Sequence, residues 1–389
     1  MSPQIFAAAT SGTTNLAILE LGVVFIGLGL LSWLAVKLHI SSVPLFLLAG
    51  LSLGKGGVAP LALSEDFLNI GAEIGALMLL LVMGFEYSAQ DLVGTLRTKW
   101  AIGIVDVLVN SVPAALLALV LGFGPIGAIA FAGIMFVSSS GIASQLIRES
   151  GWSKSNVAKR ATSILVFEDI VLAPYLPILA AVTLGLTALG GLISVGVALV
   201  VTVTVFFIGM GREIPGFRAL AHSGPGPLLL LTFGIALAIS GGANLAGFSG
   251  VIAAFLFGLL LTGEVAESLR SRFAPLRDVF SAVFFLFFGL SIAAIDVIAV
   301  LPIAICFAVI GVAGKFYVGW LMGKDLNDPF AWRRIGAFLS SRGEFSMIIA
   351  ATVAATSTFP AKEITLGIVV LTTFFSTLAI RAFRSKFEH

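Results

Sequence analysis

Apolar residues occur along this chain in long runs, and polar residues are concentrated in the short stretches between them. A helix needs about 20 mostly apolar residues to cross the hydrocarbon core of a membrane. Applied along the chain, this length predicts thirteen membrane-spanning helices and no linker to a separate soluble domain. The predicted spans are residues 15–36, 43–61, 66–87, 99–122, 125–147, 158–184, 186–210, 226–243, 245–262, 277–297, 298–322, 332–356 and 363–383. We therefore expect an all-α integral membrane protein, with residues 1–389 forming one membrane domain.

The composition supports a membrane protein and excludes several other classes. Hydrophobic residues make up 59% of the chain and charged residues only 11%, whereas soluble domains carry about 25% charged residues. The net charge of +2 offers no basic surface for nucleic acid. A single cysteine, Cys306, cannot form an intramolecular disulfide or a cysteine-based metal site. His39, His222 and His389 lie in predicted loops or at the terminus without metal-ligand spacing, so we expect neither an enzyme nor a bound cofactor.

The distribution of basic residues predicts the orientation in the membrane. If the N-terminus lies outside, eighteen of the 22 Lys and Arg residues fall in inside loops or the C-terminal tail. Only Lys55 and Lys362 then lie in outside loops, and Lys315 and Arg342 lie within spans. Because inside loops are enriched in Lys and Arg, we expect an outside N-terminus and a cytoplasmic C-terminus.

Ionisable side chains inside the predicted spans are the first candidates for function. Each is penalised by about 2.5–3.5 kcal/mol on insertion scales, so such residues are usually functional or paired. The clear cases are Asp106, Glu168, Asp169, Lys315, Arg342 and Glu344. Four acids face two bases, so at least one carboxylate lacks a basic partner of its own and is expected to bind a proton or a metal cation.

Glu168 and Asp169 lie side by side near the middle of the sixth predicted span, in the stretch ILVFEDIVLAPYL. Adjacent helical residues point about 100° apart, because a helix has 3.6 residues per turn. One of the two carboxylates can therefore face a cavity while the other faces a packed helix. The alternative is that both serve only to neutralise basic partners within the helix bundle.

Two spans are interrupted by residues that continue a helix poorly. The fifth contains FVSSSGIAS, residues 136–144, and the twelfth contains LSSRGEFSM, residues 339–347. Serine competes for backbone hydrogen bonds and glycine weakens a helix, and paired interruptions point to a binding site midway through a transporter. The two spans lie an odd number of spans apart and so run in opposite directions, as an inverted repeat requires. The alternative is two kinks that only ease helix packing.

Several stretches resemble the monovalent cation:proton antiporter-2 family, which includes sodium/proton exchangers and glutathione-gated potassium efflux antiporters. The resemblance covers nearly the whole chain, in the expected order and spacing. The stretches that carry it are VPLFLLAGLSLGKGG, LMLLLVMGFEYSAQDL, SSSGIASQLIRESG, ILVFEDI, GFSGVIAAFLFGLLL, FSAVFFLFFGLSI and SSRGEFSMII.

The resemblance implies a fold and a mechanism. It implies a homodimer with interleaved dimerisation and core subdomains, two crossed interrupted helices beside the acidic helix, and elevator-like movement of the core. Asp169 matches the ion-binding carboxylate of the family, and Lys315 matches the lysine that pairs with the first acid, here Glu168. Arg342 and Glu344 match the charged residues at the second interruption.

The acidic pair departs from both patterns of the family. Electrogenic sodium exchangers resemble Asp-Asp at these positions and potassium efflux members resemble Gln-Asp, whereas this chain has Glu-Asp. The coupled cation and the charge moved per cycle therefore stay open. Potassium efflux members also append a soluble regulatory domain, which we do not expect here, since only residues 381–389 follow the last predicted span.

From these observations we expect a secondary antiporter that exchanges Na⁺ or K⁺ for protons by alternating access. Asp169 and the hydroxyls of Ser139 and Ser140 are expected to coordinate the cation, and protons on the carboxylates are expected to displace it. Charge compensation is expected from Lys315, Arg342, Glu344 and Asp106.

Two alternatives and one pairing hypothesis accompany this expectation. A cation channel lined by the same acids and a symporter for organic anions, with Arg342 as the anion clamp, both remain possible on the same residues. Asp106 lies in the span that an inverted repeat relates to that of Lys315, so we expect Asp106 to compete with Glu168 for Lys315. Membrane lipid is the only other partner that we expect.

Overall fold

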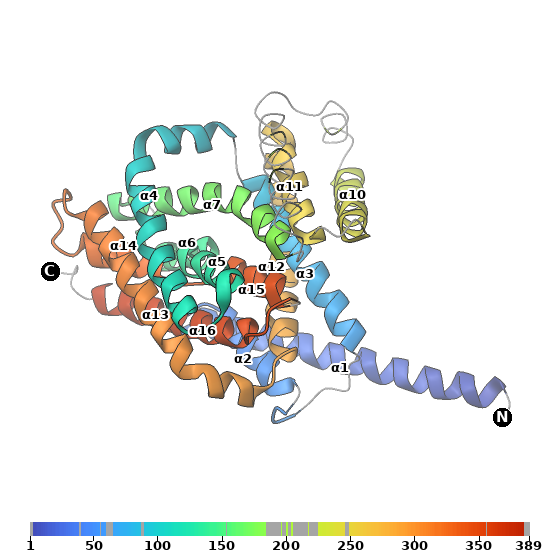
Figure 1. Cartoon of the computed structure of the whole chain (residues 1–389). Helices are drawn as coiled ribbons and strands as arrows, with labels where there is room; N and C mark the ends of the chain where they lie inside the picture. Colours follow the sequence, from blue (N-terminus) through green and yellow to red (C-terminus); the bar gives the residue numbers. More distant parts are fainter. Residues whose placement is uncertain are drawn as a thin grey trace.

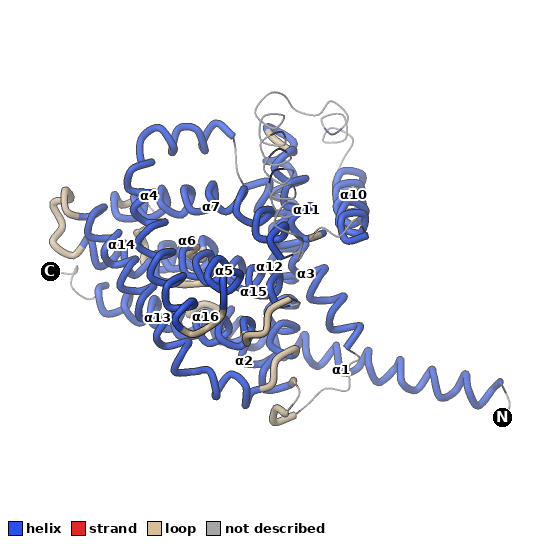
Figure 2. Tube along the Cα trace, viewed as in Figure 1, coloured by secondary structure: helices blue, strands red, loops and turns tan. Residues whose placement is uncertain are grey.

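A computed structural model describes residues 3–38, 40–54, 56–59, 65–86, 89–152, 154–183, 225–245, 249–354 and 356–384, with four single positions between 184 and 224. Within these ranges all regular structure is helical (Figures 1 and 2). The helices are α1 (Pro3–Leu38), α2 (Val43–Leu53), α3 (Glu65–Glu86), α4 (Ala89–Val120), α5 (Gly124–Phe136), α6 (Ser140–Glu149), α7 (Asn156–Thr183), α10 (Pro225–Leu245), α11 (Gly250–Leu260), α12 (Gly263–Leu290), α13 (Ala294–Gly323), α14 (Ala331–Ser340), α15 (Glu344–Ala354) and α16 (Ala361–Arg384).

The helices agree with an all-α membrane protein. In the described part of the chain, eight helical segments are long and apolar enough to cross a membrane, and three further apolar helices are shorter. The predicted seventh span, 186–210, lies outside the described residues except for single positions. The total of thirteen spans and the inverted repeat therefore stay predictions.

Two predicted spans have the wrong boundaries. The tenth was predicted at 277–297, but α12 already begins at Gly263 and ends at Leu290, and α13 begins at Ala294. A hydropathy rule misses the first half of α12 because that half contains charged residues. It also misses the break between α12 and α13, because the sequence stays mostly apolar across Ser291–Ala293. The second span, predicted at 43–61, is helical only to Leu53.

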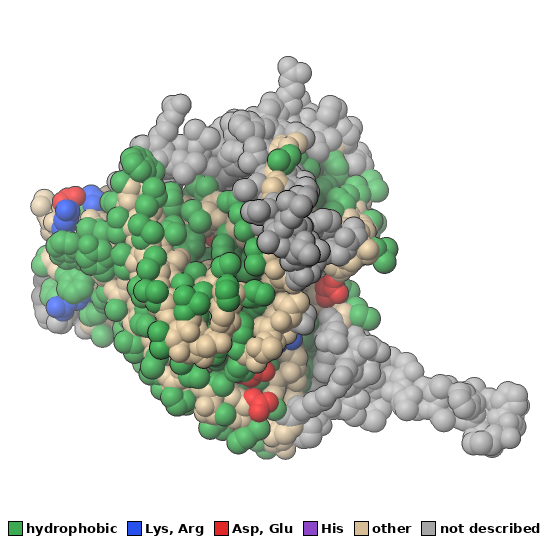
Figure 3. All heavy atoms as spheres, viewed as in Figure 1, with side chains coloured by type: hydrophobic (Ala, Val, Ile, Leu, Met, Phe, Trp, Pro, Cys, Tyr) green, Lys and Arg blue, Asp and Glu red, His purple; other side chains and the backbone are tan. Residues whose placement is uncertain are grey.

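The outer surface shows where lipid contacts the protein. Large apolar side chains are exposed at helical spacing along one face of α4 and one face of α13, and Figure 3 shows a mostly hydrophobic surface over these helices. The exposed residues include Ile104, Leu108, Val112 and Leu116 on α4 and Ile298, Leu301, Ile305 and Val309 on α13. Such stripes on an aqueous surface would be unfavourable, whereas in a membrane they face hydrocarbon.

The opposite face of α13 holds the centre of the molecule together. It packs against α4, α14 and α16, and Phe307 stacks on Phe131 of α5 with ring centroids 4.3 Å apart. The short helices α5, α6 and α15 lie in the middle of the bundle, with α4, α7, α13 and α16 around them (Figure 1). The interrupted helices are therefore surrounded by protein, the setting in which non-helical backbone is tolerated at membrane depth.

Candidate ion-binding site

The two predicted interruptions exist, and they contact each other. Helix α5 ends at Phe136 and α6 begins at Ser140, while α14 ends at Ser340 and α15 begins at Glu344. The backbone N–H of Ser139 donates a 2.8 Å hydrogen bond to the carbonyl of Ser341. The hydroxyl of Ser138 donates to the carbonyl of Leu339 at 2.7 Å. These bonds join the two broken segments at their breaks, as the resemblance implied.

The contact between the breaks requires a glycine. A Cβ atom added to Gly343 would lie 2.5 Å from the Oγ atom of Ser139 and 2.6 Å from its Cβ atom. Any other residue at this position would push the two segments apart. The close approach of Ser139 therefore requires a glycine at position 343, the glycine of the RG pair.

The carboxyl ends of α5 and α14 converge on Arg342. This side chain is fully buried and donates to the carbonyls of Met135 at 2.6 Å and Leu339 at 3.1 Å. It also donates to the carbonyl of Ser340 at 3.4 Å. Each helix carries about half a negative charge at its carboxyl end, so one guanidinium balances two ends that have no water to solvate them.

The amino ends of α6 and α15 converge on Glu344. This residue is the first of α15 and accepts a 3.0 Å hydrogen bond from the Ser139 hydroxyl. A Cβ atom added to Gly141, in the first turn of α6, would lie 3.6 Å from its Oε1 atom. Among the described side chains Arg342 and Glu344 form no ion pair with each other, although one residue separates them. Each instead compensates the helix ends of opposite sign.

Lys315 bridges two carboxylates from two other helices. Its Nζ atom lies 2.7 and 3.0 Å from the two carboxylate oxygens of Asp106 and 2.9 Å from Oε1 of Glu168. All three side chains are at most 1% exposed. Asn110 donates a further 3.0 Å bond to Asp106, and the ring of Phe136 lies under the ammonium at 5.5 Å. Lys315 thus contacts both carboxylates at once, and competition between Asp106 and Glu168 for it stays a hypothesis.

Glu168 also connects the acidic helix α7 to the first break. Its carboxylate accepts from the backbone N–H of Ser138, and its Oε1 atom lies 3.0 Å from the Ser138 hydroxyl, whose one proton it shares with the carbonyl of Leu339. Ser138 was not among the predicted site residues. Its place at the start of the serine run was visible in the sequence, but which of the three serines faces the acid depends on the shape of the break.

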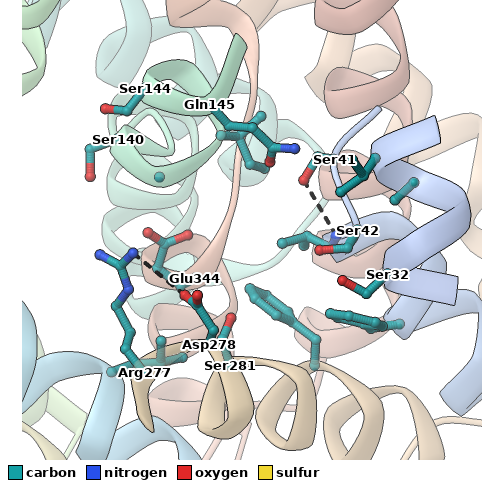
Figure 4. A pocket seen from close by; sticks show the side chains of 18 residues that line it. Ser32, Ser41, Ser42, Ser140, Ser144, Gln145, Arg277, Asp278, Ser281 and Glu344 are labelled. Atoms are coloured by element: carbon teal, nitrogen blue, oxygen red, sulfur yellow. Dashed lines mark hydrogen bonds and ion pairs between the residues drawn. The ribbon is translucent and has the colours of Figure 1, made fainter. Parts of the chain in front are cut away.

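A hollow of about 590 Å³ reaches the breaks from one side of the bundle. Figure 4 shows polar side chains around it from α1, α6, α12 and α15 and from Ser41 and Ser42, which precede α2. Ser140 and Glu344, the first residues of α6 and α15, are part of its lining. Its lining does not include Asp169, which is 4% exposed on α7. Of the predicted ion-binding residues Asp169, Glu168, Ser139 and Ser140, only Ser140 lines the hollow.

The chain is similar to cation/proton antiporters along most of its length. Residues 21–383 match the family described as sodium/hydrogen exchanger, transmembrane. The chain is 29% identical over 345 residues to the ammonium/H⁺ antiporter subunit AmhT of Alkalihalophilus pseudofirmus, covering 86% of this chain and 85% of that protein. It is 25% identical over 343 residues to the K⁺/H⁺ antiporter subunit KhtU of Bacillus subtilis, with the same coverage.

A solved structure shares the fold. The sodium proton antiporter MjNhaP1 of Methanocaldococcus jannaschii, determined at pH 8, superposes with a TM-score of 0.58 and 18% sequence identity. The match covers 95% of this chain and 98% of that one. The arrangement of helices around the breaks is therefore one that a sodium/proton antiporter also adopts.

Removing Lys315 or Asp106 is expected to destabilise the protein in a coupled way. Lys315→Gln leaves two buried carboxylates without their ammonium and is expected to lower stability by about 3–5 kcal/mol. Asp106→Asn in the same chain is expected to recover part of this loss, with a coupling energy of about 0.5–3 kcal/mol. Thermal unfolding of the two single variants and the double variant in detergent measures the coupling. Additive effects would show that the two side chains do not interact.

Gly343→Ala is expected to separate the breaks. The added methyl group collides with Ser139, and overpacking of this kind typically destabilises by about 1–3 kcal/mol. Gly234→Ala, on α10, is the matched control, because a Cβ atom there meets nothing within 4 Å. The melting temperature in detergent should fall for the first variant and hold or rise for the second. A Gly343→Ala protein as stable as the wild type would contradict the contact.

Proposed function

The chain belongs to the sodium/hydrogen exchanger family, and from this premise we propose that it carries Na⁺ or K⁺ against protons at a site formed by Asp169 and the two helix breaks. As a member of this family it is a secondary antiporter of the membrane and not an enzyme. The observation that supports the site proposal is the contact of the first break with the acidic helix, where the backbone N–H of Ser138 donates to Glu168, while a hollow borders Ser140 and Glu344 at the ends of the two breaks.

Asp169 and the hydroxyls of Ser139 and Ser140 are the proposed ligands of the transported cation. Carboxylate and hydroxyl oxygens are hard ligands that suit alkali ions. Ser341 adds a candidate oxygen, since its buried hydroxyl has no hydrogen-bond partner among the described residues. Protons that load the carboxylates remove the negative charge that holds the cation. Cation and proton therefore bind in turn, and the protein carries each in one direction.

Lys315 is proposed to stay on Asp106 while Glu168 exchanges partners. One ammonium cannot neutralise two carboxylates, so Glu168 is at most half compensated when both are ionised. A cation or a proton bound at Glu168 and Asp169 supplies the positive charge that Lys315 alone cannot. Asp106 and Asn110 then keep Lys315 in place whenever Glu168 turns to the incoming ion.

The orientation and assembly of the sequence analysis are part of this proposal. With the N-terminus outside, the hollow borders Ser41, which follows the end of α1 that the basic residues place in the cytoplasm, and also Arg277 in the middle of α12. The described conformation then faces inward. We infer a homodimer in a bacterial cell membrane, with dimerisation and core subdomains interleaved in residues 1–389. Helix α1 supports the dimer, because its residues 19–38 are apolar and only 17% of that segment is buried within one copy.

The organic-anion alternative loses its main support. It needs the guanidinium of Arg342 to be presented to a solute, but Arg342 is fully buried and donates to three backbone carbonyls. It does not line the hollow. Its position therefore fits a helix-end charge better than an anion clamp.

Asp169→Asn is expected to abolish exchange. An amide keeps the size of the side chain but can neither carry the charge nor release a proton. Proteoliposomes with an internal pH dye, given Na⁺, K⁺ or NH₄⁺ in turn, should show cation-dependent proton flux for the wild type and background flux for the variant. Flux against the cation gradient, driven by a pH difference, excludes a channel. Full flux in Asp169→Asn would remove Asp169 from the site.

Asp106→Asn is expected to weaken cation binding without abolishing exchange. Lys315 then keeps only Glu168 as a carboxylate partner, so the cation competes with an ammonium that cannot move aside. We expect the apparent KM for the cation to rise about tenfold, equivalent to ~1.4 kcal/mol, with a maximal rate that falls less. Asp296→Asn, an exposed acid at the start of α13, is the control. An unchanged KM would contradict the exchange of partners.

A further inference from the structure

The hollow beside the breaks is rich in oxygen atoms. Hydroxyl groups are its commonest polar side chains, contributed by Ser32, Ser41, Ser42, Ser140, Ser144 and Ser281. Its charged residues are Arg277, Asp278 and Glu344. Arg277 and Asp278 lie 3.5 Å apart in an ion pair, drawn in Figure 4. The lining therefore carries a net negative charge, and Glu344 is the acid outside that pair.

Glu344 is placed to contact an ion in the hollow. The residue is 8% exposed and lines the cavity. Among the described residues its one hydrogen bond comes from the Ser139 hydroxyl to Oε2, and no basic side chain lies within ion-pair distance of it. Its Oε1 atom has no hydrogen-bond partner in this part of the chain. A nearly buried carboxylate with an unused oxygen beside a polar cavity attracts a cation.

We propose that Glu344 forms a second cation site, separate from that of Asp169, in which a partly hydrated alkali cation rests in the hollow beside the breaks. Its direct ligand is the Glu344 carboxylate, and the Ser140 and Ser144 hydroxyls, which line the same hollow, bind the ion or its water shell. This inference rests on the proposed function, since it assumes that a monovalent cation passes this way. It adds a stopping place for the cation before it reaches Asp169.

The helix ends at Glu344 set how tightly this site binds. The amino ends of α6 and α15 each carry about half a positive charge, which offsets the carboxylate and falls off within the first turn. The site is therefore weaker than a bare carboxylate would be, which suits an ion that must move on. A different reading gives Glu344 only the task of balancing the two ends, and in that reading no cation binds there.

A site of this kind affects the apparent affinity more than the maximal rate. A cation held at Glu344 raises the chance that Asp169 receives one when its protons leave. Glu344→Gln is therefore expected to raise the apparent KM for the cation by about tenfold, with a maximal rate at saturating cation within about twofold of the wild type. A helix-balancing role predicts a loss of stability without this separation of KM from the maximal rate.

Cation-dependent thermal stabilisation of purified protein in detergent tests the site directly. A ligand that binds the folded state raises its melting temperature by mass action. NaCl and KCl are each compared with choline chloride at equal ionic strength. Asp169→Asn should keep part of the shift produced by Na⁺ or K⁺, and the double variant with Glu344→Gln should lose it. Glu344→Asp, which keeps the charge, should retain a smaller shift, and Asp296→Asn should retain the full one.

The choline measurement separates misfolding from lost binding. A Glu344→Gln protein that melts cooperatively in choline chloride is folded, and its cation response can then be read. The proposal is overturned if Asp169→Asn shows no cation shift, or if the double variant keeps the shift of Asp169→Asn. Failure of the proposed function is a separate result, namely wild-type proteoliposomes without cation-dependent proton flux.

Discussion

One ammonium group shared by two carboxylates organises the centre of this protein. Lys315 on α13 holds Asp106 on α4 and Glu168 on α7 at 2.7 and 2.9 Å. Charges buried in hydrocarbon must be compensated inside the protein, because no water is available to solvate them. Three helices are fixed relative to each other by this requirement alone. In the proposed mechanism one ammonium leaves part of the negative charge of the two carboxylates uncompensated, and the transported cation or a proton compensates it.

At the two breaks, the buried charges that must be compensated are the partial charges of helix ends. Breaking two helices at membrane depth exposes four ends, two negative and two positive. Arg342 takes the negative ends and Glu344 the positive ones, so both residues of the RGE sequence serve opposite ends across a single glycine. Ser138 joins this arrangement to the acidic helix, because it bonds both Glu168 and the carbonyl of Leu339. In the proposed mechanism, a change of hydrogen-bond partner at Glu168 therefore alters the contacts of Ser138, which lies in the first break and bonds the carbonyl of Leu339 at the second.

The sequence predicted the elements whose physical signal is local and missed those that depend on packing. Serine runs and glycines disfavour a helix wherever they occur, so both breaks were located correctly, and charges within spans identified Lys315 and Glu168. The start of α12 at Gly263 was missed because its first half is charged, although it is helical. Ser138 and Asn110 were missed because their roles depend on which rotamer faces which helix. The hollow and its contact with Glu344 could not be predicted, since an empty space between α1, α6 and α12 leaves no pattern in any one segment.

The two neighbouring acids, Glu168 and Asp169, have different surroundings. Glu168 accepts hydrogen bonds from the backbone N–H of Ser138 and from Lys315, so an ion that approaches it must displace a protein group. The extra methylene of glutamate, compared with the aspartate of sodium exchangers, gives its carboxylate the reach to bond the break and the lysine at once. Asp169 points about 100° away around α7 and is not a partner of Lys315 in this bridge. In the proposed mechanism Glu168 therefore links the charge at Lys315 to the first break, while Asp169 is the proposed ion ligand, and a Glu-Asp pair separates these two roles.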